Sequence, residues 1–156
     1  MIAMKFGGSS LAAAPEIERV ARLVRARLDR HPLVVVSAMA KTTRQLLETG
    51  EAAARGDLQG ARQAARELRK FHVREGKAVA AASDRALLET LLDGHFGSHD
   101  HVLQEITLAG LVTPRLADAV VAFGELMSSA IFTFALRNAG VDAEWIDCRS
   151  VLATDD

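Results

Sequence analysis

The arrangement of apolar positions changes along the chain, and the changes predict the order of its secondary-structure elements. Residues 2–6, IAMKF, form a short apolar run that two glycines interrupt, which predicts a strand. After Pro15, apolar residues recur at helical spacing and charged residues take the opposite face, which predicts an amphipathic helix. Residues 33–38, LVVVSA, are a continuous run typical of a strand covered on both faces of a parallel sheet. This order indicates an α/β fold.

The pattern becomes helical between about residues 42 and 111, where Ala, Leu, Arg and Glu dominate and strand signals are absent. We predict a helix-rich insertion here, divided by Gly56 and Gly94 and by capping residues Asp57 and Ser83. Residues 94–101, GHFGSHDH, are expected to form a loop, with a further helix from about 101 to 111.

The last part of the chain predicts one long helix and one more strand. Pro114 begins an apolar helical segment that Gly140 is expected to end, and residues 141–147, VDAEWID, predict a third strand. Three parallel strands are few for so many helices. We therefore expect residues 1–156 to be the N-terminal part of a larger domain with an incomplete parallel sheet and flanking helices.

Composition narrows the class of protein. A length of 156 residues fits about one domain, and a net charge of −1 gives no general basic field for nucleic acid or an anionic membrane. The single cysteine excludes an internal disulfide framework, and no signal peptide or apolar run of roughly 20 residues is evident. These features favour a cytoplasmic protein.

Lys5, Gly7 and Gly8 are the first candidates for chemistry. The two familiar glycine-rich phosphate motifs are absent, so the residues also fit an edge lysine followed by a turn. A phosphate cradle is the alternative, since glycines let backbone N–H groups approach phosphate oxygens and lysine supplies a positive charge.

Three further features carry polar side chains in apolar surroundings. Ser37 ends the second predicted strand at the sheet edge where α/β folds bind ligands, although a turn-capping serine fits as well. Glu125 lies in a mostly apolar helix and needs a partner, a ligand or an exposed position. The histidines and aspartates of residues 93–101 are interpreted as a polar loop, and no metal site is predicted.

The order of four motifs is more specific than any one of them. KFGGSS, VVVSAMAKTT, FGELMSS and WIDCRSVLATDD resemble, in this order, the N-terminal part of the aspartate kinases, which have the amino-acid kinase fold. Ser9 stands where that family usually has threonine and keeps the hydroxyl. The resemblance extends over essentially all 156 residues and is loosest in the helical middle.

This resemblance implies transfer of the γ-phosphoryl group of ATP to the β-carboxylate of L-aspartate, the first step toward lysine, threonine and methionine. It implies that Lys5 contacts the transferred phosphate and that the backbone of residues 6–9 holds it (Phe6, Gly7, Gly8, Ser9). Ser37, Thr43 and Glu125 match aspartate-binding positions, with Glu125 receiving the ammonium group. Mg²⁺ is expected with ATP as co-substrate, without a tightly bound cofactor.

The resemblance also implies parts that these residues lack: the later substrate and catalytic segment, the adenine-nucleotide segment and the ACT regulatory domains. We therefore expect residues 1–156 alone not to turn over and to self-associate through apolar surface, and the parent protein to be a homo-oligomer. Two alternatives stay open: another amino-acid kinase with a different carboxylate acceptor, and a non-catalytic α/β module that binds a ligand or partner.

Overall fold

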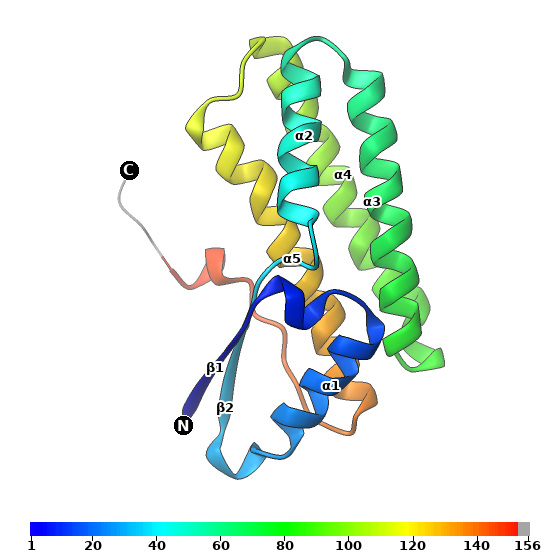
Figure 1. The fold of residues 1–156 in the computed structure, drawn as a ribbon, viewed down its shortest axis with the longest axis vertical. Helices are drawn as coiled ribbons and strands as arrows, with labels where there is room; N and C mark the ends of the chain where they lie inside the picture. The colour runs from blue at the N-terminus through cyan, green and yellow to red at the C-terminus, as the bar shows by residue number, and fades with distance from the viewer. Residues whose placement is uncertain (153–156) are drawn as a thin grey trace.

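The computed structural model describes residues 1–152, which form a small parallel sheet and five long helices (Figure 1). The sheet lies at one end of the molecule, and α2 to α4 extend away from it beside the first half of α5. The elements are β1 (Ile2–Phe6), η1 (Gly8–Leu11), α1 (Ala14–Arg25), η2 (Leu28–Arg30), β2 (Pro32–Val36), α2 (Thr42–Ala54), α3 (Leu58–Val79), η3 (Ala82–Asp84), α4 (Arg85–Ala109), α5 (Pro114–Asn138) and η4 (Cys148–Ser150).

The two strands confirm the predicted α/β beginning of the chain. β1 and β2 are parallel and joined through α1, with Lys5 opposite Val35 in the register. Helix α1 buries the apolar face that its periodicity predicts, at Ile17, Val20, Ala21 and Val24. The expectation that β2 is covered on both faces is wrong for the described residues. Leu33 and Val35 are 53% and 45% exposed, because the helices pack only against the alternate positions of the strand.

The helical insertion is confirmed as α2, α3 and α4. Asp57 begins α3 as an N-cap that accepts a hydrogen bond from the Gly60 N–H at 2.8 Å. The loop predicted at residues 94–101 is wrong, because α4 runs through it without a break. Tertiary packing explains the difference, because α4 keeps one buried face throughout, with Leu92, His99 and Leu103 on it. Burial of this face stabilises the helix by more than Gly94 and Gly97 destabilise it.

Helix α5 packs against every other long helix and against β2. Thr113 caps its N-terminus through a bond from the Leu116 N–H, and Gly140 follows its end with φ of +79°. By length and hydropathy α5 is the one helix among the described residues that could cross a membrane. It is 72% buried over its most apolar 18 residues, which is the environment of a core helix.

Residues 141–147 do not form the predicted third strand. The segment is held against α5 instead, where the Trp145 indole N–H donates to the Ser129 hydroxyl at 2.8 Å and Arg137 donates to the Ala143 carbonyl at 2.9 Å. A cavity separates it from β2, so its backbone has no strand to pair with in the part of the chain described. The last four residues of the WIDCRSVLATDD motif, 153–156, lie outside the described residues.

Candidate active site

Two loops meet where the strands end, and backbone hydrogen bonds join them. The Ser37 N–H donates to the Phe6 carbonyl at 3.0 Å, and the Ala40 N–H donates to the Gly8 carbonyl at 3.2 Å. The loop after β1 and the loop after β2 therefore form one surface at the carboxyl edge of the sheet. Open α/β sheets bind their ligands at this edge.

The two glycines of the first loop have different roles. A Cβ on Gly8 would lie 2.6 Å from the carbonyl oxygen of Ala38, so only glycine allows the loops to approach this closely. A Cβ on Gly7 would meet no atom within 4 Å, and its φ of −82° and ψ of 169° suit any residue. Packing thus explains Gly8 but not Gly7, whose exposed backbone leaves space for a ligand.

Lys5 and Ser9 are exposed on this surface, whereas Phe6 is half-buried and packs against the core. Lys5 lies on the uncovered face of the sheet, at the position paired with Val35. No carboxylate within residues 1–152 forms an ion pair with Lys5. Its charge is therefore free to act on a ligand.

Glu125 reaches the second loop from α5. Its Oε1 accepts a hydrogen bond from the Ala38 N–H at 3.1 Å and lies 3.4 Å from the Ser37 hydroxyl, which donates to it. Gly124 makes this approach possible, because a Cβ there would lie 2.7 Å from the Cβ of Ala38. The structure shows no hydrogen bond from residues 1–152 to the second carboxylate oxygen, Oε2.

Thr43 does not take part in this contact. It is exposed in the first turn of α2, and residues 1–152 make no hydrogen bond with its side chain. The neighbouring Thr42 is fully buried, and its hydroxyl oxygen lies 3.4 Å from the His72 Nε2. The sequence-predicted residues thus divide into a connected group around Glu125 and an exposed threonine nearby in the chain.

Two residues of the second loop were not found from the sequence. Ala40 has a φ of +48°, which a non-glycine residue adopts only at a cost, and Lys41 is a second exposed cation immediately before α2. Neither residue stands out in the sequence SAMAKTT. An alanine with a strained backbone cannot be told from any other alanine by its residue type.

Two buried histidines lie in the helical layer behind this loop, and both have a lowered pKa. His72 on α3 has its Nδ1 2.8 Å from the Leu68 carbonyl, so this nitrogen carries the proton, and burial lowers its pKa. His99 on α4 lies 3.2 Å from the Thr49 hydroxyl, and burial lowers its pKa to about 4. Within residues 1–152 no group of three or more metal-ligating side chains is found.

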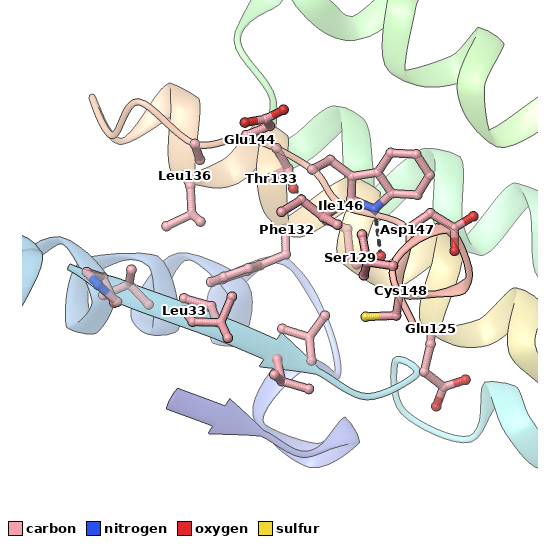
Figure 2. A pocket seen from close by; sticks show the side chains of 18 of the residues that line it. Leu33, Glu125, Ser129, Phe132, Thr133, Leu136, Glu144, Ile146, Asp147 and Cys148 are labelled. Atoms are coloured by element: carbon pink, nitrogen blue, oxygen red, sulfur yellow. Dashed lines mark hydrogen bonds between the residues drawn. The ribbon is translucent and has the colours of Figure 1, made fainter. Parts of the chain in front are cut away.

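A large apolar cavity lies beside the site without containing it. Its volume is about 1080 Å³, and it is bounded by β2, by α5 and by residues 141–152. Figure 2 shows Leu33 and Phe132 on its walls and Glu125 at one end, next to the loop after β2. Lys5, Gly7 and Gly8 do not line it. A mostly apolar cavity does not suit a charged ligand, so the polar loop surface is the better candidate.

The polar surface combines an exposed lysine, open backbone at a glycine and a carboxylate whose Oε2 accepts no hydrogen bond from residues 1–152. Such a set can hold an anionic group at one side and a cationic group at the other. No nucleophilic Cys, Ser–His pair or His general base is among these residues, which suits chemistry that depends on alignment and charge neutralisation.

The chain belongs to the amino acid kinase family, whose profile it matches over residues 1–155. Among curated relatives, it is 32% identical to aspartokinase 2, chloroplastic, of Arabidopsis thaliana over 98% of this chain and 28% of that protein. It is 31% identical to the bifunctional aspartokinase/homoserine dehydrogenase 1, chloroplastic, of Zea mays over 97% of this chain and 16% of that protein.

Solved structures give the same assignment for the fold. Aspartokinase III of E. coli in complex with lysine and aspartate, in the T-state, superposes with a TM-score of 0.82 at 27% identity. The same enzyme with aspartate and ADP, in the R-state, gives 0.77 at 31% identity. Each comparison covers 100% of this chain and 33% of that one, so this chain spans about a third of their length.

Proposed function

We propose that this chain forms the phosphate-binding and aspartate-binding part of an aspartate kinase, which transfers the γ-phosphoryl group of ATP to the β-carboxylate of L-aspartate. The observation that carries the proposal is the junction of the two loops, where Gly8 meets Ala38 and Glu125 holds the same Ala38. This junction supports the proposal, because it joins the loop that follows Lys5 to the loop that Glu125 contacts.

On the phosphate side, Lys5 would face the transferred group, and the backbone of residues 6–9 would hold it. Gly7 supports this role because packing does not require a glycine there: a Cβ at this position would meet no atom within 4 Å. A phosphate oxygen, in contrast, needs close access to backbone N–H groups, which a glycine provides. Mg²⁺ belongs to the ATP co-substrate in this proposal and would neutralise charge on the phosphate oxygens.

On the aspartate side, Glu125 would receive the ammonium group through its unoccupied Oε2, while Oε1 keeps its bonds to the loop. Ser37 and Thr43 would bind the polar ends of the substrate. The ADP and aspartate in the E. coli aspartokinase III complex support this pairing of ligands for a chain of the same fold.

The reaction needs no general base from these residues. A β-carboxylate is already ionised near neutral pH, so its oxygen can attack the γ-phosphorus directly. A bond forms between that oxygen and phosphorus, the bond to the bridging oxygen breaks, and ADP leaves with the electron pair. The products are β-aspartyl phosphate and ADP. Alignment of two anions is the main task, and Lys5 lowers their repulsion.

The test uses the full-length protein that contains this chain and measures ADP release in a coupled assay with aspartate. Lys5→Ala is expected to lower kcat/KM at least about 100-fold, because one charge on the transferred group is lost. Lys70→Ala, which removes an exposed lysine that pairs with Glu67 on the same helix, is the matched control and should change nothing. Aspartate failing as acceptor, or Lys5→Ala keeping full activity, would overturn the proposal.

Three expectations about the protein accompany this proposal. Residues 1–156 alone should not release ADP, since two thirds of the length of the structural relatives lies outside the match. The parent protein is proposed to be a cytoplasmic homo-oligomer. Exposed Leu33 and Val35 are an apolar surface through which the isolated chain would self-associate.

A further inference from the structure

Glu75 on α3 contacts the start of α1 at Ala14, although Glu75 and Ala14 lie 61 positions apart in the chain. Its Oε2 accepts a hydrogen bond from the Ala14 N–H at 2.9 Å, and Ala14 is the first residue of α1. Glu75 is only 8% exposed, so this carboxylate has been withdrawn from water in order to make the contact. A carboxylate buried to this degree needs such a partner.

The N-terminus of α1 lacks a cap of its own. The N-cap position is Ala13, whose side chain cannot accept a hydrogen bond, and Pro15 removes one N–H from the first turn. Glu75 therefore supplies, from another helix, the hydrogen-bond acceptor that a Ser, Asp or Asn at the N-cap would supply locally. Its negative charge also suits the positive end of the α1 dipole.

The position of Glu75 is fixed by its surroundings on α3. Gly76 packs so closely that a Cβ there would lie 2.8 Å from the Leu88 Cδ2 and 3.3 Å from the Ile131 Cγ1. This closeness locks α3 against α4 and α5. The second carboxylate oxygen, Oε1, accepts from the Arg74 Nε at 2.7 Å, which orients the group further.

The contact lies directly after the glycine loop. Only the rest of the short helix η1, which begins at Gly8, and two alanines separate Gly8 from Ala14, and Leu11 within this stretch is 1% exposed. The loop is thus held at one end by the Ala40–Gly8 bond and at the other by Glu75. Only the first of these contacts comes from the neighbouring loop, and the second comes from the helical insertion.

We propose that Glu75 is a positioning residue for the phosphate loop: it fixes the start of α1 and thereby the geometry of residues 7–13. The proposal rests on the proposed function as far as it concerns ATP. The helical insertion contributes no predicted substrate contact beyond its first turn. The proposal gives it a role in ordering the nucleotide side of the site.

Two substitutions remove the bond from opposite sides. Glu75→Ala deletes the acceptor, and Ala14→Pro deletes the donor while leaving α3 unchanged. Proline suits the first position of a helix, and the extended Ala13 before it, with φ of −155°, has the conformation that a following proline requires. Glu75→Gln keeps an acceptor oxygen, and Glu67→Ala on the exposed surface of α3 is the control.

Kinetics of the full-length protein give the first measurement. Glu75→Ala and Ala14→Pro should each raise KM for ATP about 5- to 10-fold and change KM for aspartate less than about 2-fold, since only the phosphate loop is loosened. The double variant should resemble each single one, because both remove the same bond. Glu75→Gln should recover most of the loss. Equal effects on both KM values, or an equal effect of Glu67→Ala, would overturn the proposal.

Hydrogen exchange separates failure of this inference from failure of the proposed function. Amides of residues 9–13 should exchange faster in Glu75→Ala and Ala14→Pro than in the parent, while those of α4 stay unchanged. This holds whatever the protein phosphorylates. Unchanged exchange at residues 9–13 in Ala14→Pro, whether or not Glu75→Ala folds, would overturn the positioning role even if aspartate kinase activity is found.

Discussion

Glu125 on α5 accepts a hydrogen bond from the backbone N–H of Ala38, 87 residues earlier in the chain, at 3.1 Å. The carboxylate predicted to bind substrate is therefore also a structural contact that fixes the loop after β2. Because Ala38 in turn lies against Gly8, Glu125 influences both halves of the candidate site. A substitution at Glu125 must be designed so that the two roles can be separated.

Glu125→Gln should separate them. The amide oxygen can still accept from Ala38, so the free energy of unfolding should change by less than about 1 kcal/mol, while the lost charge weakens binding of the aspartate ammonium group. We expect KM for aspartate to rise at least about 10-fold with KM for ATP nearly unchanged. Glu125→Ala, which leaves Ala38 without its acceptor, should also destabilise the fold by about 1–3 kcal/mol. Steady-state kinetics and urea unfolding check the two effects. An unchanged KM for aspartate in Glu125→Gln would remove the substrate role.

Substitutions at the adjacent glycines should have opposite consequences. Gly8→Ala brings a Cβ to 2.6 Å from the Ala38 carbonyl oxygen, so the loops must separate, and we expect a loss of about 1–3 kcal/mol of stability. Gly7→Ala meets no atom within 4 Å and should keep the parent melting temperature. If Gly7 gives access to phosphate, Gly7→Ala should nevertheless raise KM for ATP.

Thermal unfolding and ATP kinetics of both variants check this pair, and each variant serves as the control for the other. A Gly7→Ala variant with parental stability and parental KM for ATP would show that the open position at Gly7 has no role in nucleotide binding.

Much of the fold could be predicted from the sequence, because local patterns determine much of it. The β-branched run and the helical periodicity of α1 each predict their element directly, and Asp57 and Gly140 mark helix ends by well-understood capping chemistry. The errors concern context. Residues 94–101 contain two glycines and polar residues, yet the buried side of α4 continues through His99. Residues 141–147 have strand composition but no partner strand within residues 1–152.

The site was predictable only in part, for a related reason. The residue types of Lys5, Ser37 and Glu125 stand out in short motifs, whereas their relation depends on contacts between distant parts of the chain. Glu75 illustrates this limit. It lies in a charged stretch of α3 typical of a solvated helix face, and nothing local indicates that it caps α1.

Acid should destabilise the fold through His99. The Thr49 hydroxyl donates to the Leu46 carbonyl at 2.6 Å, so the His99 Nε2 carries the proton that Thr49 accepts. A second proton would have to bind Nδ1, which is buried without a partner among the described residues, and burial lowers the His99 pKa from 6.5 to about 4. The unfolded state then binds more protons between these values, so stability is present above pH 6.5 and decreases as the pH falls toward 4.

The expected loss from His99 is about 3 kcal/mol by pH 4, and His72 adds to it in the same direction because burial also lowers its pKa. Urea unfolding between pH 7 and pH 4 measures it. His99→Gln should flatten the pH dependence, whereas His101→Gln, on the exposed side of the same helix, should leave it unchanged. Parallel curves for the parent and His99→Gln would contradict the assignment.

Ala40 offers the last test, because it has a left-handed backbone at the junction of the two loops. Its φ of +48° costs a non-glycine residue roughly 1 kcal/mol, and His31, also at +48°, has the same strain in the turn before β2. Glycine at either position should relieve this strain and stabilise the protein by up to about 1 kcal/mol in urea unfolding. His31→Gly is the control remote from the site. If the strain at Ala40 maintains the loop contact with Gly8, Ala40→Gly should alone raise KM for ATP or aspartate, because the relaxed loop samples further conformations. Equal stabilisation with unchanged kinetics in both variants would mean that the strain at Ala40 only serves the turn.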